Sequence, residues 1–208
     1  MEKTTGEMMR DTILNNIRKS LGREAVKTLE ESLAAHTVQP AFGETLIYKF
    51  IKQLTKVSGT FESILNSKEI PFAVLEFLQK HNLPQEIVID SCLKSLPWPN
   101  KLHLAYRAAQ AEDMVSLSCG FAGIAETGSL VLLSSPGSPT TLNFLPDNHI
   151  VVLHKDNLVA HIEDVWARIG TMPRSVNIIT GPSRTADIEQ TIQLGAHGPR
   201  RLHLLLVK

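Results

Sequence analysis

The sequence has little cysteine and no excess charge of either sign, and each shortage excludes a class of protein. Its two cysteines, Cys92 and Cys119, are far apart, and no Cys-x-x-Cys motif is present. The chain alone therefore offers no ligand set for an iron–sulfur cluster or a thiolate zinc site. Lys and Arg together number 21, as do Asp and Glu, so the net charge is zero. Because phosphate backbones are bound by a basic surplus, this balance argues against a nucleic-acid partner.

The sequence also lacks long apolar runs. No stretch approaches the roughly 18 consecutive apolar residues that a membrane helix needs. Residues 1–22 mix charged and apolar side chains without the apolar centre of a signal peptide. Two lone thiols fit a reducing compartment. We therefore expect a cytoplasmic protein without a membrane span.

Several catalytic signatures are missing as well. There is no Gly-x-Ser-x-Gly elbow, which argues against serine hydrolysis. Neither a Gly-x-Gly-x-x-Gly loop nor a P-loop is present, which argues against a standard dinucleotide or nucleotide site. No His-Glu-x-x-His pair occurs, so no metal site is predicted and the cofactor is left unknown.

What is present is a regular alternation of helical and strand patterns. Apolar residues at helical spacing predict helices over 5–21, 24–35, 44–57, 70–81, 157–169 and 185–194. Short apolar runs predict strands over 60–64, 86–89, 102–105, 115–118, 129–133, 150–154, 175–180 and 201–207. The alternation indicates a layered α/β fold with a largely parallel sheet. We expect residues 1–40 to form an N-terminal helical extension and residues 41–208 to form the α/β domain.

The stretch 177–188 is the most informative in the chain. An apolar run is followed by Gly181 and Pro182, then by Ser183, Arg184 and Thr185 before a helical pattern. This order predicts a strand, a tight turn and the first turn of a helix, where free backbone N–H groups and the helix dipole favour an anion. Two hydroxyls and a forked cation would complete a pocket for a carboxylate or phosphate.

Each of these residues also has a structural interpretation. Ser183 or Thr185 would serve as the helix N-cap, which leaves the other hydroxyl for a ligand. Arg184 would either hold an anion through two hydrogen bonds or form an ion pair with Glu126 or Asp187. Asp187 itself would suit the first turn of a helix, where negative charge is favoured.

A second candidate site is the glycine-rich loop 119–128. Glu126 follows apolar residues and precedes Thr127, Gly128 and an apolar strand, which suggests a partly desolvated carboxylate. Such a group would act as a base, a nucleophile or a hydrogen-bond acceptor. The alternative is a structural carboxylate that caps a turn or pairs with Arg184. We expect this loop, including Thr127 and Gly128, to face the anion pocket.

The turn 195–199 offers a third group. His197 lies between glycines, with Gly198 directly after it, so its ring is left uncovered to act as acid, base or metal ligand. His149 precedes a strand and would reach the same side. Trp98, between two prolines, would form either a lid or a surface anchor.

Three segments, Ala125-Glu126-Thr127-Gly128-Ser129, Gly181–Glu189 and Gly195–Pro199, occur in this order and together resemble the lactate utilization (LUD) domain family. The likeness is strong from about Val115 onward and loose before it. Ser129 is a departure, since the family usually has threonine there, but the hydroxyl is kept.

The resemblance implies an α/β fold of the type shared by coenzyme A transferases and ribose-5-phosphate isomerase. It also implies a role in the oxidation of L-lactate to pyruvate, together with iron–sulfur partner subunits. A chain without cluster cysteines would then be the subunit that lacks its own cluster. Two other hypotheses remain open. One is a stand-alone enzyme that uses Glu126 on a small acyl or phosphosugar substrate, and the other is a non-catalytic module that senses a carboxylate or phosphate.

Overall fold

The structure is a computed structural model, and it describes residues 5–20, 41–186, 192–194 and 198–208. The chain divides into two units, Met1–Pro40 and Ala41–Lys208. In the first unit, helix α1 (Thr5–Ser20) lies where the apolar spacing predicts it, while the expected helix over 24–35 is outside the described residues. In the part of the chain that is described, no helix combines the length and apolarity needed to cross a membrane.

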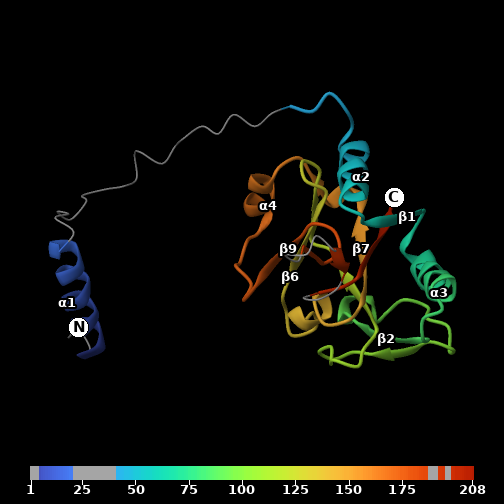
Figure 1. Cartoon of the computed structure of the whole chain (residues 1–208), viewed down its shortest axis with the longest axis horizontal. Coiled ribbons are helices and arrows are strands. Elements are labelled where there is room, and N and C mark those ends of the chain that lie inside the picture. The colour runs from blue at the N-terminus through green and yellow to red at the C-terminus, as the bar shows by residue number, and fades with distance from the viewer. Residues whose placement is uncertain (1–4, 21–40, 187–191, 195–197) are drawn as a thin grey trace. The chain divides into compact units, whose positions relative to one another are not determined.

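The second unit is built on a six-stranded sheet in which every neighbouring pair is parallel (Figure 1). In spatial order the strands are β1 (Thr60–Ile64), β12 (Arg201–Val207), β7 (Asn148–His154), β4 (Val115–Cys119), β2 (Glu86–Ile89) and β3 (His103–Ala105). Each strand corresponds to a predicted one, and β3 is an edge strand. The expected α/β class with a largely parallel sheet is confirmed.

Both faces of this sheet are covered, which explains why its strands are apolar almost throughout. On β7, Ile150 and Val152 pack into a core with helix α3 (Ile70–Lys80). The alternate residues Val151 and Leu153 pack on the opposite face. There the covering elements are a second sheet and α2 (Leu46–Lys56), whose Phe50 and Leu54 side chains are fully buried.

The second sheet has four strands. In spatial order they are β8 (Leu158–Val159), β5 (Ala122–Ile124), β6 (Ser129–Leu133) and β9 (Val176–Ile179). Helix α4 (Ile162–Arg168) packs Val165 on its outer face. The prediction of one helix over 157–169 is therefore wrong in its first part, because Leu158 and Val159 pair with β5. Short 3-10 turns complete the unit, namely η1 (Ser67–Glu69), η2 (Ser91–Leu93), η3 (Thr140–Asn143) and η4 (Lys155–Asn157).

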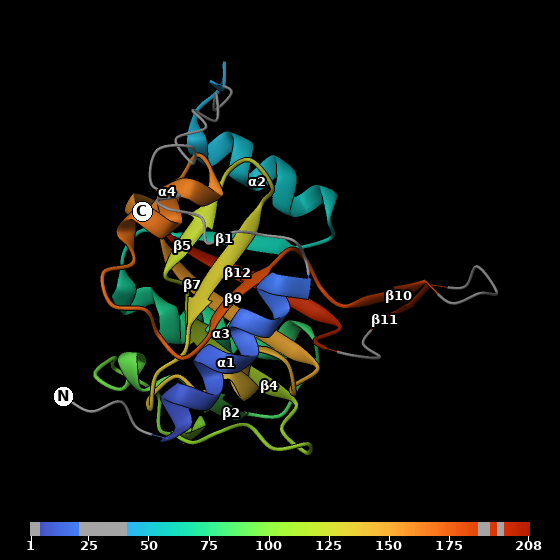
Figure 2. The same cartoon turned by 90° about the vertical axis from the view of Figure 1, so that its left-hand side faces the viewer.

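The prediction of a helix over 185–194 is also wrong. Strand β10 (Arg184–Ala186) pairs antiparallel with β11 (Ile192–Leu194). Figure 2 shows this hairpin projecting from the two sheets. The backbone groups of β10 and β11 are satisfied by cross-strand hydrogen bonds, so the helical spacing of a few apolar residues does not decide the structure of this segment. No helix N-terminus therefore exists at Ser183 to polarise an anion site.

The two cysteines are not separate thiols, contrary to expectation. Cys92 lies in η2, just after β2, and Cys119 is the last residue of β4. Because β2 and β4 are neighbouring parallel strands, their carboxyl ends meet, and the two cysteines form a disulfide there. Asp90 lies within 4.8 Å of both sulfur atoms, but a disulfide is not a thiolate ligand set for a metal ion.

Candidate functional site

Three sequence segments singled out above meet at the end of α2 and the turn that leads into β1. The backbone N–H of Ser183 donates to the Pro199 carbonyl at 2.8 Å. Gly198 lies against Ser183, since a Cβ added to this glycine would be 3.3 Å from the serine Cβ. We use the name turn cluster for residues 126–128, 181–184 and 198 together with Val57 and Ser58.

One glycine from each of two of these turns fits closely against the end of α2. Gly128 has φ +71°, and a Cβ on it would lie 2.3 Å from the backbone nitrogen of Leu54. Gly181 has φ +76°, and its Cβ would lie 2.4 Å from the carbonyl oxygen of Val57. Both the left-handed backbone and the close approach require glycine. The two motifs therefore share one structural function, which is to seat the end of α2.

A chain of hydroxyl groups links the same two turns. The Ser129 hydroxyl is 2.6 Å from that of Thr127 on one side and 2.6 Å from that of Thr180 on the other. Ser129 is buried, whereas Thr127 and Thr180 are exposed at the two ends. This chain accounts for a hydroxyl residue at position 129.

Arg184 reaches back to the α2–β1 turn. Its guanidinium donates to the hydroxyl of Ser58, a residue held in the left-handed region at φ 67°. Arg184 is exposed, and no ion pair joins it to Glu126 among the described residues. Since its partner is a neutral hydroxyl, the positive charge of Arg184 is not compensated there by a described carboxylate.

Glu126 is instead paired with His161. Its Oε2 atom lies 3.1 Å from Nδ1 of His161, and the side chains are 43% and 6% exposed, respectively. The His161 ring is also 5.0 Å from the ring of Phe42, centroid to centroid. The backbone N–H of His161 donates to the Asp164 carboxylate at the start of α4. Sequence reasoning missed His161, although an acid three residues after a polar residue is the known signature of a helix start.

The structure places the remaining candidates as follows. Asp187 and His197 lie outside the described residues, and Thr185 is the middle residue of β10. Trp98 is an anchor rather than a lid, since its Nε1 donates to the Leu93 carbonyl at 2.9 Å and its ring packs on the core.

His149 does not reach the turn cluster. It is fully buried on β7, and its Nε2 faces the Ser118 hydroxyl at 2.5 Å. Its other ring nitrogen, Nδ1, is buried without a hydrogen-bond partner. Burial lowers the pKa of His149 to about 3, so the ring is neutral at ordinary pH. It is therefore a core residue.

A separate surface cavity of about 740 Å³ has the composition of an anion site. It is lined by Ser134, Ser135, Pro136, Pro139, Thr140, Arg174 and Ser175. The hydroxyls of Ser134 and Ser135 each accept a backbone N–H, at 2.8 and 3.0 Å. Their own hydrogens are thus left to donate, and no acid is among the lining residues. We name this cavity the Arg174 cavity.

The sheet order and the turn cluster define an α/β domain whose distinctive sequence motifs lie together at the end of α2. A family model for the LUD domain matches residues 47–207 of this chain. The chain therefore belongs to the LUD domain family, and the resemblance read from the three motifs is confirmed.

Individual proteins give the same result. Lactate utilization protein C of Anoxybacillus flavithermus is 34% identical over 221 residues, which cover 95% of this chain and 98% of that protein. An uncharacterized protein of Neisseria meningitidis is 37% identical over 106 residues. That match covers 47% of this chain and 46% of the relative, so it spans about half the length of each.

One solved structure supports the fold. A DUF162 family protein from Deinococcus radiodurans superposes with a TM-score of 0.60 and covers 81% of this chain and 100% of its own. The two sequences are 17% identical, so this likeness concerns the fold alone.

Proposed function

We propose that this chain acts in lactate utilization, as a subunit that works with iron–sulfur partners in the oxidation of L-lactate to pyruvate. The observation that carries the proposal is the similarity to lactate utilization protein C over nearly the whole of both chains. Oxidation of lactate removes two electrons, which need an acceptor. Both cysteines of this chain are held in one disulfide, so the thiolates of a cluster would come from another subunit.

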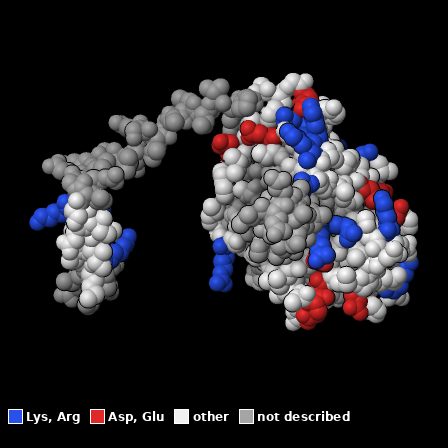
Figure 3. Space-filling model, in the orientation of Figure 1, with Lys and Arg blue, Asp and Glu red and all other residues white. Residues whose placement is uncertain are grey.

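The same proposal includes a cytoplasmic location, which no longer rests on free thiols because Cys92 and Cys119 form a disulfide, and which cell fractionation tests. It also includes no nucleic-acid partner. On the face shown in Figure 3, the basic and acidic side chains of the described residues are interspersed. Such a mixed surface supports a protein or small-molecule partner over a polyanion.

The assembly is tested by purification from cells grown on L-lactate. We expect the tagged chain to copurify with an iron-containing, cysteine-rich partner, and the isolated chain to show no lactate-dependent dye reduction. Cells grown on another carbon source provide the control for induced partners. Lactate oxidation by the isolated chain, or the absence of any iron-containing partner, would contradict this function.

One observation favours a second function. The His161 ring fixes the orientation of the Glu126 carboxylate at the rim of the turn cluster, as a stand-alone enzyme would need for a base or nucleophile. If the isolated chain turns over a small acyl or phosphosugar substrate, the Glu126→Gln variant, purified and assayed in the same way, decides whether Glu126 takes part in the reaction. Loss of turnover would support this second function, and full activity would remove Glu126 from it.

The ligand of the first function is a small carboxylate or phosphate. We propose that the turn cluster binds it, with Thr127, Gly128, Gly181, Pro182, Ser183, Arg184, Thr185, Asp187 and Gly198 around it and Glu126 and His197 as the reacting groups. The uncompensated charge of Arg184 supports this placement. Within the described ranges its guanidinium contacts the neutral hydroxyl of Ser58, and it would gain a charge-assisted pair when a carboxylate arrives.

A matched pair of arginine variants tests the placement. We expect Arg184→Ala to weaken the binding of L-lactate or inorganic phosphate by roughly 1.5–3 kcal/mol, measured by calorimetry. Arg174→Ala removes another exposed guanidinium, that of the Arg174 cavity, and is expected to leave binding unchanged. If Arg174→Ala weakens binding and Arg184→Ala does not, the anion binds in the Arg174 cavity. If neither variant changes the affinity, neither site binds the anion.

A further inference from the structure

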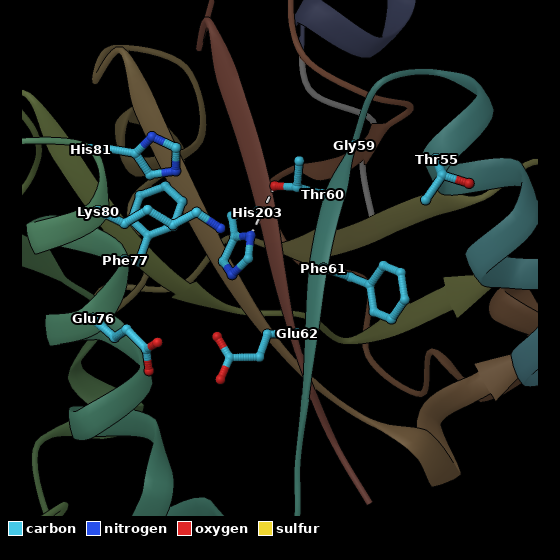
Figure 4. Close-up of a pocket in the computed structure, with 10 residues that line it drawn as sticks. All are labelled: Thr55, Gly59, Thr60, Phe61, Glu62, Glu76, Phe77, Lys80, His81 and His203. Atoms are coloured by element: carbon cyan, nitrogen blue, oxygen red, sulfur yellow. Dashed lines mark hydrogen bonds between the residues drawn. The ribbon is translucent and has the colours of Figure 1, made fainter.

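A second concave site lies between β1 and α3 and includes none of the proposed site residues. Its volume is about 420 Å³. It is lined by Thr55, Gly59, Thr60, Phe61, Glu62, Glu76, Phe77, Lys80, His81 and His203 (Figure 4). Five of these ten residues carry titratable groups other than hydroxyls, and no cavity of this kind was expected from the sequence. We name it the His203 cavity.

His203 presents a free nitrogen here. The Thr60 hydroxyl oxygen lies 3.3 Å from the Leu202 carbonyl oxygen and 2.8 Å from Nδ1 of His203. We assign the hydroxyl proton to the bond with the Leu202 carbonyl, which puts the ring proton on Nδ1 and leaves a lone pair on Nε2. Nε2 is buried without a hydrogen-bond partner, in a residue only 8% exposed. In Figure 4 this nitrogen is directed towards the space between Glu62 and Glu76.

The histidine is neutral, which keeps the lone pair available. Burial, and then the nearby His81 and Lys80, lower the pKa of His203 to about 4. Its ring is held in place by stacking on Phe77, with centroids 4.7 Å apart. A buried acceptor without a donor is costly, so a donor from a ligand would recover that free energy.

Two carboxylates stand beside this nitrogen. Glu62 comes from β1 and Glu76 from α3, and Figure 4 shows them on facing sides of the gap. Burial raises the pKa of the Glu62 carboxyl, and repulsion from Glu76 raises it further against the opposing effect of Lys80. Three acceptors in one cavity, two of which repel each other, create a site that a positively charged donor would stabilise.

An organic cation fits better than a metal ion. Among the described residues, only Asp90, Cys92 and Cys119 hold their ligand atoms close enough for one ion to bind all three. The acceptors of the His203 cavity are thus too widely spaced for joint coordination. A volume of about 420 Å³ also exceeds that of an ion and suits a small molecule.

The cavity also carries a cation for the other end of a ligand. Lys80 follows Glu76 by one helical turn and lies at the cavity wall, and it forms no ion pair within the described residues. Together, the acceptors and the Lys80 ammonium in one cavity match a molecule that bears both charges.

We propose that the His203 cavity binds a small zwitterionic amine of the amino-acid class. The ligand ammonium donates to Nε2 of His203 and to the Glu62 carboxylate, the Glu76 carboxylate adds negative potential beside it, and the ligand carboxylate pairs with Lys80. This site is separate from the turn cluster, and the proposal does not depend on a role in lactate oxidation.

The test uses the full chain and ligand-observed NMR with each of the common amino acids. L-Lactate is the matched control for L-alanine, since it carries a hydroxyl in place of the ammonium. We expect saturable binding of at least one amino acid, and we expect that L-lactate does not displace it. Glu62→Gln is expected to weaken the binding of the amino acid by about tenfold or more, because a charge-assisted hydrogen bond is lost. Glu112→Gln, an exposed substitution outside the cavity, should leave binding unchanged.

Three outcomes would overturn the proposal. The first is that no amino acid binds at millimolar concentration. The second is equal binding by the wild type and Glu62→Gln. The third is that the wild type binds Zn²⁺ or Mn²⁺ but no amino acid, and that Glu62→Gln loses this metal binding. The cavity would then be a metal site. Because Glu62 is partly exposed on an edge strand, its isosteric glutamine variant is expected to fold.

Discussion

Gly128→Ala is expected to destabilise the protein by about 3–5 kcal/mol, because two costs arise at the same position. The first is the left-handed backbone at φ +71°, which a residue with a Cβ adopts only under strain. The second is steric, since the added Cβ would lie 2.3 Å from the Leu54 nitrogen and 2.6 Å from the Gln53 carbonyl carbon. These atoms belong to helix backbone, so no side chain can rotate out of the way.

The consequence should reach beyond the turn. To make room, α2 must shift away from the β5–β6 turn, and its buried Phe50 and Leu54 side chains would lose contact with both sheets. The end of α2 also carries the turn to Ser58, which Arg184 contacts. A substitution in one motif is therefore expected to weaken any ligand binding that depends on the other.

Urea unfolding measures the free energy of unfolding directly. Gly170→Ala is the matched control, because this glycine has a φ outside the left-handed region and no heavy atom lies within 4 Å of the position that an added Cβ would take. We expect the control to change stability by less than about 0.5 kcal/mol. A Gly128→Ala protein as stable as the control would show that α2 is not seated on this turn.

The elements that sequence reasoning predicted well are those whose local pattern agrees with their burial. The strand predicted over 60–64 is β1, and the strand predicted over 201–207 is β12. The helix predicted over 70–81 is α3, whose buried face includes Val74 and Leu78. In β12 and α3 the apolar residues are buried, and in β1 Ile64 is buried, so the apolar pattern and the tertiary structure favour the same conformation.

The predictions that failed concern segments whose structure depends on a distant partner. β5 was expected as part of a glycine-rich loop, because its three residues become a strand only through pairing with β6 and β8. The same holds for Leu158 and Val159, which local spacing assigns to a helix. Two cysteines 27 residues apart are brought together by strand order, which local sequence does not encode.

The candidate site shows the same division. The motifs identified the turns at Gly128 and Gly181, both of which have a positive φ that favours glycine, whereas most of the turn predicted over 195–199 lies outside the described residues. Their shared contact, the end of α2, lies far before both of them in the chain, and no spacing rule points to it. The pairing of Glu126 with His161 instead of Arg184 was equally hidden, since sequence distance does not report spatial distance.

Acidification is the second perturbation with a large expected effect. His149 and His203 are buried and neutral, and burial lowers their pKa values from 6.5 to about 3 and about 4, respectively. In the unfolded chain these rings take up protons near pH 6.5, whereas the folded protein excludes them until a much lower pH. The unfolded state therefore binds more protons below pH 6.5, and stability is lost as the pH falls towards the folded pKa values.

The expected size is about 1.4 kcal/mol per pH unit for each histidine, which amounts to about 4 kcal/mol for both at pH 5. This is a large part of the roughly 5–15 kcal/mol that holds a typical domain folded. Urea unfolding at intervals from pH 7.5 to pH 5 measures the slope. His203→Phe keeps a ring that can stack on Phe77 but takes no proton, so its slope should fall to about half of the wild-type value.

The slope is the useful quantity, because His203→Phe also loses the hydrogen bond to Thr60 and so lowers stability at every pH. His154→Gln, an exposed substitution on the same sheet, is the control for the loss of a histidine as such. If His203→Phe follows the wild-type slope, the ring is already accessible to protons in the folded protein. The lone pair on Nε2 would then be solvated, and the His203 cavity would lose the unsatisfied acceptor on which its affinity for an ammonium group depends.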